Sequence, residues 1–229
     1  MQAKDVMTTP VVTVKPETKV SEIARLLLER GISAVPVVDE KERLLGIVSE
    51  GDLMRRPESG TQRRPSWWLA LFSDLREEAR EYVKSHGLHA RDVMTRDVIT
   101  VGEDASLQEI AALLEKHRIK RVPVVRDGKV VGIVSRANLL QALVAQPPEK
   151  QVSADDRTLR EEVLKAVQSV GAGTVFVNAV VSEGVVHLWG VAASGEVKDA
   201  IRVAAERVPG VKQVKDEIKV LPRRAMGYE

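Results

Sequence analysis

The sequence predicts an α+β protein that contains a duplicated strand-helix-strand-strand-helix unit followed by a small third domain. Three observations support this prediction: an internal repeat, a change from helical to alternating hydrophobic spacing within each copy, and a proline-bearing linker at 146–150. The 229 residues leave room for more than one domain, because a domain ordinarily has on the order of 150 residues.

Composition narrows the class of protein. Hydrophobic residues make up 44% of the chain and aromatic residues 3%, so aliphatic side chains must form the core. With no cysteine, disulfides, thiolate metal sites and thiol catalysis are excluded. The net charge of +2 provides no broad basic field for nucleic acid. The chain lacks a long apolar run, and "MQAKDVMTTP" lacks the order of a secretory signal, so we expect a cytoplasmic protein.

The repeat spans about fifty residues and needs one single-residue gap. An offset of 87 residues aligns its first part, and an offset of 86 aligns its end after a shorter turn. The paired segments are "KDVMTTPVVTV" (4–14) with "RDVMTRDVITV" (91–101), "VPVV" (35–38) with "VPVV" (122–125), and "GIVS" (46–49) with "GIVS" (132–135). A match of this length and order indicates a duplicated unit.

Within the first copy, residues 20–29 carry apolar side chains at helical spacing. Residues 32–49 form two β-rich runs around a charged turn, which predicts a hairpin, and a last helix begins at Ser49. Between the copies, 55–65 is an arginine-bearing linker and 66–87 is a predicted amphipathic helix. Its segment "WWLALF" (67–72) is apolar on every side, which predicts that it is buried between two chains.

The tail predicts a separate helix-strand-strand-helix-strand domain. The expected elements are a helix at 157–170, strands at 174–181 and 185–191, a helix from Ser194, and a strand at 211–220. In the second of these strands, alternation separates Val186, Leu188 and Gly190 from Val185, His187, Trp189 and Val191. We expect both helices to cover the Val186–Leu188 face, with Gly190 admitting a close helix. Trp189 would then be a partner anchor on the open face, or fold back over its own sheet or the linker.

The repeated junction is the candidate functional feature. Ser49 and Asp52 end the first hairpin, and Ser135 and Asn138 occupy the same positions in the second copy. A serine followed three residues later by an acid is a capping box. The same groups at a helix start can also hold an anion and a ribose diol. Spacing alone leaves both interpretations open.

The two copies resemble CBS domains (named after cystathionine β-synthase) in their "DVMT" opening, "PVV" strand and "GIVSxxDL" close. The resemblance implies a tandem pair of β-α-β-β-α units with pseudo-twofold symmetry that binds AMP, ADP, ATP or S-adenosylmethionine in its clefts. Asn138 would bind a ribose more weakly than Asp52, whereas Lys120 and Arg121 would favour phosphates in the second site. The implied ligand-binding residues are Thr13, Val14, Ser33, Ala34, Val35, Ser49 and Asp52 in the first site, and Thr100, Val101, Lys120, Arg121, Val122, Ser135 and Asn138 in the second.

The tail resembles a BON domain through "GVVHLWGV" (184–191) and its order of elements. BON domains are associated with envelope, phospholipid or polymer contacts, although the balanced charge of this tail favours a protein partner. The expected boundaries are CBS repeat one at 1–56, the insert at 57–90, CBS repeat two at 91–146, a linker at 147–153 and the BON domain at 154–222.

The resulting hypothesis is a cytoplasmic regulatory protein that senses adenine nucleotides and signals through its BON domain. We expect a homodimer formed through the CBS pair and the 66–87 helix, no catalytic cofactor, no metal site and no enzymatic activity, since no nucleophile–base pair is evident. Two alternatives remain: a structural adaptor without a ligand, and a phospholipid- or envelope-associated protein.

Overall fold

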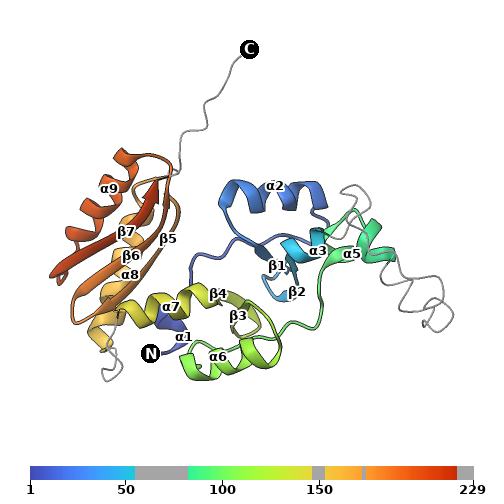
Figure 1. Cartoon of the computed structure of the whole chain (residues 1–229), viewed down its shortest axis with the longest axis horizontal. Coiled ribbons are helices and arrows are strands. Elements are labelled where there is room, and N and C mark those ends of the chain that lie inside the picture. The colour runs from blue at the N-terminus through green and yellow to red at the C-terminus, as the bar shows by residue number, and fades with distance from the viewer. Residues whose placement is uncertain (55–81, 146–152, 172–173, 221–229) are drawn as a thin grey trace, which may run out of the picture. The chain divides into compact units, whose positions relative to one another are not determined.

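The computed structural model describes residues 1–54, 82–145, 153–171 and 174–220. The chain divides into two compact units, and each mixes helices with strands, in agreement with the predicted α+β class (Figure 1). The middle unit contains residues 10–100 and 125–131. The tail unit contains residues 1–9, 101–124 and 132–229.

The middle unit is built on an antiparallel hairpin covered by a helix. Its elements are α2 (Val20–Arg30), β1 (Ala34–Val38), β2 (Leu44–Ser49), α3 (Glu50–Leu53) and α5 (Ala90–Val93). Helix α2 ends at Gly31, which adopts the left-handed conformation that glycine favours (φ 60°). The core is aliphatic, as the composition predicts, and its fully buried members are Ile23, Val35, Val37, Val48, Ala90 and Val93.

The CBS part of the tail unit repeats this pattern. Its elements are α1 (Ala3–Val6), α6 (Leu107–Lys116), the paired strands β3 (Arg121–Arg126) and β4 (Lys129–Ser135), and α7 (Arg136–Ala145). Residues 125–131, at the turn between β3 and β4, are grouped with the middle unit. Helix α6 is capped by Ser106, whose hydroxyl accepts from the Glu109 amide while the Glu109 carboxylate accepts from the Ser106 amide. This reciprocal cap is the local reason that the helix starts there.

The opening segment of the first copy belongs to the tail unit, and the opening segment of the second copy belongs to the middle unit. Thr8 exchanges backbone hydrogen bonds with Ile133 in the tail unit, and Thr95 does the same with Ile47 in the middle unit. The methionine before each threonine lies against a glycine of "GIVS". A Cβ atom on Gly132 would lie 2.2 Å from Met7 Sδ, and one on Gly46 would lie 2.6 Å from Met94 Sδ. Both copies therefore have glycine at this position because a methionine side chain occupies the space that a Cβ atom would need.

The C-terminal domain of the tail unit confirms the predicted element order. It contains α8 (Ala154–Gln168), β5 (Thr174–Ser182), β6 (Val185–Ala192), α9 (Gly195–Glu206) and β7 (Gln213–Val220). Strand β6 is central, antiparallel to β5 and parallel to β7. Both helices cover one face of the sheet, where Val186 and Leu188 are fully buried, as expected (Figure 1). The expected role of Gly190 was wrong: it admits the neighbouring strand, because a Cβ there would lie 1.8 Å from the Phe176 carbonyl oxygen.

The opposite face of this sheet carries Asn178, Val180, His187 and Trp189, which are brought together by the β5–β6 register. This face is not open along β5, because α1 and α7 contact that strand and Asn178 and Val180 are buried. Trp189 is half-buried and stacks on His187, with ring centroids 5.4 Å apart. His187 is 4% exposed, and its Nδ1 is a buried side-chain atom without a hydrogen-bond partner in the described part of the chain.

Burial lowers the pKa of His187, as does Lys215, whereas Glu217 opposes the shift. The folded chain consequently binds fewer protons than the unfolded chain below about pH 6.5, and its free energy of unfolding falls as the pH drops from there. We predict that His187→Gln removes this part of the loss of stability between pH 7.5 and 5.5, measured by urea unfolding. The exposed His117 is the control site, and a His187→Gln profile that parallels wild type would contradict the prediction.

Candidate ligand site

The first junction combines a capping box with an accessible carboxylate. Ser49 donates from its backbone nitrogen and its hydroxyl to Asp52 Oδ2, at 3.0 and 2.7 Å. The Glu50 amide donates to the Ser33 carbonyl, and Ala34 pairs with Ser49 in the hairpin register. The fold therefore brings the 33–35 segment beside the Ser49–Asp52 turn, although the two lie more than ten residues apart in sequence.

Lys84 is a member of this site that the sequence did not reveal. Its Nζ lies 2.8 Å from Asp52 Oδ1 and 3.3 Å from Thr95 Oγ1. Its side chain is 43% exposed, whereas that of Asp52 is 13% exposed, so the lysine can move without unpacking a core. Lys84 belongs to the insert, which has no counterpart in either copy, and the repeat alignment could not assign it. Residues 82–86 are helical as predicted, and "WWLALF" lies outside the described residues.

The other candidate residues of the first junction also lie in the middle unit. Val14 is buried and pairs in parallel with Val37 of β1, and Thr13 precedes it. Ala34 and Val35 are buried at the start of β1. Val14 and Val35 belong to the hydrophobic core of the middle unit, and Ala34 pairs with Ser49 next to the carboxylate of Asp52.

The second junction has the same backbone geometry but a different environment. Ser135 donates from its nitrogen and hydroxyl to Asn138 Oδ1, at 2.8 and 2.7 Å. Asn138 Nδ2 donates to the Val6 carbonyl at 3.0 Å and to Thr8 Oγ1 at 3.2 Å. Asn138 is 3% exposed. An amide side chain has two acceptor and two donor positions. The two Ser135 contacts fill the acceptor positions, and Val6, Thr8 and Gln141 Oε1, at 3.4 Å, share the two donor positions.

Asp52 retains an acceptor position for a further hydrogen bond, whereas Asn138 does not. A carboxylate offers about four acceptor positions. Described residues take three of those on Asp52, two through Ser49 and one through Lys84. The two junctions therefore differ in chemistry: the first presents a partly exposed anion with a movable cation, and the second presents a buried amide with fixed partners.

The remaining residues of the second set are placed as follows. The Val101 amide donates to the Pro123 carbonyl at 3.1 Å, and the Lys120 carbonyl accepts from the Arg136 amide at 3.2 Å. Arg121 and Val122 begin β3, where Val122 is fully buried, and the Lys120 side chain is exposed. Thr100 is the last residue of the 10–100 segment of the middle unit. The Lys120 side chain is therefore accessible, whereas Val122 is part of the core.

Metal-binding groups and membrane-spanning helices are both absent from the described residues. Those residues contain no group of three or more His, Asp or Glu side chains placed to hold a metal ion. Nor do they contain a helix with the length and hydropathy needed to span a bilayer.

Comparison with known proteins assigns the family. The CBS domain model matches residues 3–59 and 90–145, and the BON domain model matches residues 155–222. The chain is a tandem CBS protein with a BON domain. An uncharacterized protein of Methanocaldococcus jannaschii is 31% identical over 158 residues, which cover 63% of this chain and 92% of that protein.

Two further comparisons concern one plant protein. The chloroplastic CBS domain-containing protein CBSX2 of Arabidopsis thaliana is 33% identical over 56% of this CBS-BON chain and 57% of its own length. The crystal structure of CBSX2 in complex with AMP matches with a TM-score of 0.54 and 31% identity, covering 62% of this chain and 96% of that one. The CBS-BON chain thus spans little more than half of the full-length plant protein.

The contacts of Asn138 predict how a substitution at this position changes the stability of the chain. In Asn138→Asp, a carboxylate oxygen replaces the amide donor and faces the Val6 carbonyl oxygen, which leaves a buried acceptor unpaired. We expect a loss of about 1–3 kcal/mol in the free energy of unfolding, measured by urea denaturation at pH 7.5. The matched control is Asp52→Asn, which alters a partly exposed pair and should cost at most about 1 kcal/mol. Equal effects of the two substitutions would contradict the assigned difference.

Proposed function

We propose that this CBS-BON chain is a cytoplasmic regulatory protein that binds an adenine nucleotide at the Asp52 junction and signals through its BON domain. The observation that carries the proposal is the pairing of Asp52 with Lys84 beside the apolar 33–35 segment. The AMP complex of CBSX2 supports the ligand class, because the crystallised chain is 31% identical and the match covers 96% of it.

The residues of the first junction suit the parts of a nucleotide. Asp52 would accept hydrogen bonds from ribose hydroxyls, which carboxylates bind more strongly than neutral acceptors do. Lys84 would exchange its bond to Asp52 for one to a phosphate, since a flexible ammonium is a point charge that suits this group. Val14, Ala34 and Val35 would contact the base. AMP, ADP, ATP and S-adenosylmethionine all remain candidate ligands.

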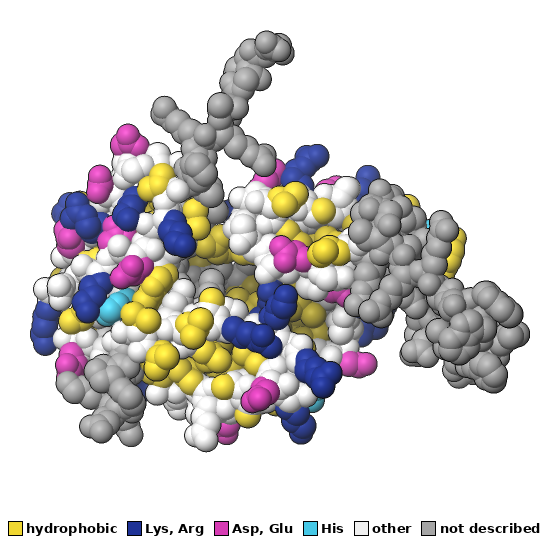
Figure 2. Space-filling view, viewed as in Figure 1, with side chains coloured by type: hydrophobic (Ala, Val, Ile, Leu, Met, Phe, Trp, Pro, Cys, Tyr) yellow, Lys and Arg dark blue, Asp and Glu magenta, His cyan; other side chains and the backbone are white. Residues whose placement is uncertain are grey.

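Regulation in this proposal requires differential binding. A nucleotide that binds one arrangement of the chain more tightly shifts the population toward it, and the shift is limited by the difference in affinity. The BON domain would report that shift to a protein partner. A protein partner suits this domain better than anionic lipid does, because Figure 2 shows basic and acidic side chains interspersed over its visible surface.

We also propose that the protein is a homodimer and that α7 contributes to the interface. Leu140, Leu143 and Val144 are 64%, 69% and 66% exposed, at i, i+3 and i+4 spacing. Figure 2 shows hydrophobic side chains gathered over this helix. Contiguous exposed apolar side chains are characteristic of interaction surfaces.

Titration of the full chain with AMP and with adenosine tests the nucleotide proposal. We predict that Asp52→Ala weakens binding of both ligands at least tenfold, because both contain the ribose diol. Lys84→Met should weaken AMP binding by a similar factor and leave adenosine binding unchanged, because only AMP carries a phosphate. A tenfold change corresponds to about 1.4 kcal/mol of binding free energy.

Thermal unfolding provides the negative test. A nucleotide at about 100 times its dissociation constant should stabilise the chain by about 2.7 kcal/mol. If AMP, ADP, ATP and S-adenosylmethionine at millimolar concentration all leave the melting temperature unchanged, the nucleotide proposal fails. The structural adaptor then becomes the preferred function, and flotation with phospholipid vesicles tests the lipid alternative.

A further inference from the structure

The BON domain contacts the CBS part of the tail unit through the sheet face opposite its own core helices. Helices α1 and α7 both contact strand β5 of that sheet. On this face Val180 is fully buried and Asn178 is 6% exposed, whereas Lys215 and Lys219 of β7 are exposed. The β5 half of the face is therefore covered from within the same compact unit.

Arg160 of α8 lies at the centre of this contact. It is 5% exposed, and its guanidinium donates to the Lys4 and Met7 carbonyl oxygens at 3.1 and 2.6 Å. Inside the BON domain it donates to Asn178 Oδ1 at 3.1 Å and to the Ala179 carbonyl oxygen at 2.7 Å. Burial lowers the pKa of Arg160 to about 10, so the side chain stays charged at neutral pH. A buried guanidinium requires acceptors, and the N-terminal segment supplies two of them.

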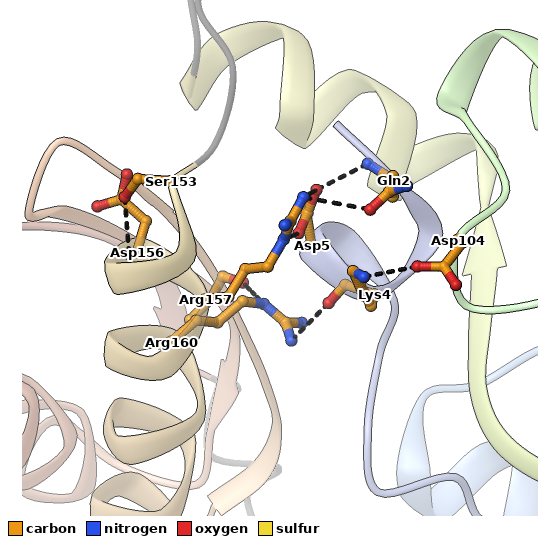
Figure 3. A network of polar contacts seen from close by, with 9 residues as sticks. Gln2, Lys4, Asp5, Asp104, Ser153, Asp156, Arg157 and Arg160 are labelled. Atoms are coloured by element: carbon orange, nitrogen blue, oxygen red, sulfur yellow. Dashed lines mark hydrogen bonds and ion pairs between the residues drawn. The ribbon is translucent and has the colours of Figure 1, made fainter.

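Arg157 and Asn178 hold the same segment from two further positions. Arg157 Nε donates to Asp5 Oδ1 at 2.6 Å, and Asp5 is 2% exposed. Asn178 Nδ2 donates to the Val6 carbonyl oxygen and to Gln141 Oε1 of α7, each at 3.0 Å. Figure 3 shows both arginines of α8 projecting toward the N-terminal segment. Because hydrogen bonds are directional, contacts from a helix and a strand together fix the orientation of the docked domain.

The opening segment of the middle unit contacts the insert instead of a BON domain. Asp92 is the counterpart of Asp5 at the offset of 87 residues. A Cβ atom on Gly87 would lie 2.3 Å from Asp92 Cβ, so the backbone of the insert packs directly against this residue. Lys84 of the insert donates to Thr95 Oγ1 at 3.3 Å. The two opening segments therefore have different covers, and the BON domain covers the one in the tail unit.

The sequence predicts a linker at 147–153, which would allow a tethered domain to move on its own. We infer that the BON domain instead moves as a fixed extension of the second CBS copy, and that a nucleotide at Asp52 repositions it by shifting the whole tail unit against the middle unit. The chain passes between these units at 9–10, 100–101, 124–125 and 131–132. Movement of packed bodies about a few connecting residues is a common form of switching. This inference rests on the proposed function and specifies its regulation.

Distances between nitroxide labels, measured by double electron–electron resonance on the full chain, test the inference. The chain has no cysteine, so two introduced cysteines are the only labelled sites. The exposed residues Glu115 of α6 and Lys165 of α8 form the docking pair, and Lys165 with the exposed Lys219 of β7 forms a reference pair within the BON domain. The docking pair should give a distance distribution as narrow as that of the reference pair, with and without AMP. A broader distribution, or a mean distance that shifts with AMP, overturns the inference.

The variant Arg157→Ala/Asn178→Ala tests the docking contacts, because it removes one hydrogen-bonding side chain from α8 and one from β5. It should broaden the distribution of the docking pair and leave the reference pair unchanged, which also shows that the BON domain remains folded. If the reference pair broadens as well, Arg157→Ala alone takes its place. The matched control is Arg202→Ala, which removes an exposed ion pair with Glu206 on α9 and should leave both distributions as in wild type. An unchanged docking pair in a folded variant overturns the assignment of docking to these side chains.

A third label pair separates the inference from the proposed function. Glu29 of α2 is exposed and lies in the middle unit, so its distance to Glu115 reports on the two units. Where calorimetry shows that AMP binds, this distance should change while that of the docking pair does not. AMP binding without this change overturns the inference. If AMP does not bind, the proposed function fails, and fixed docking is then judged by the docking pair of the ligand-free chain: a narrow distribution supports it, and a broad one overturns it.

Discussion

The carbonyl oxygen of Val6 is the contact on which the tail unit depends. It ends a four-residue helix and accepts from one asparagine of the CBS part and one of the BON domain. An acid in place of either donor would direct an oxygen at the Val6 carbonyl oxygen, and a buried acceptor without a donor costs more than the hydrogen bond contributes. The N-terminal residues thus serve both domains, and the 1–9 segment belongs to the same compact unit as the tail.

The two copies of the repeat have kept their backbone and changed their chemistry. In both, a serine donates twice to the side chain three residues later, and a methionine fills the space above the glycine. The difference between Asp52 and Asn138 follows from what lies opposite each. Lys84 faces the first and requires an anion, whereas the Val6 carbonyl faces the second and requires a donor. The two junctions therefore share a backbone geometry and differ in chemistry because different groups face them.

Much of the fold could be predicted from the sequence because its determinants are local. The hairpins and the alternation in β6 follow from short-range spacing, and the repeat follows from direct comparison of the two copies. The helix-covered face of the BON sheet was predicted correctly, although the reason given for it, a close helix at Gly190, was wrong. The site was predicted only in part. The Ser49–Asp52 contact is local, but Lys84 comes from an insert that has no counterpart in the repeat.

The contacts of Asn138 with Val6 and of Arg160 with Met7 join residues more than 130 positions apart, and no sequence spacing encodes them. Nor did the residue types alone reveal them, since an asparagine at a helix start is expected to serve as a cap. The crystal structure of the full chain grown with AMP tests the central claim most directly. The account predicts AMP at Asp52, with Lys84 moved from the carboxylate and Asn138 still bonded to Val6. AMP beside Asn138, with none at Asp52, would contradict it.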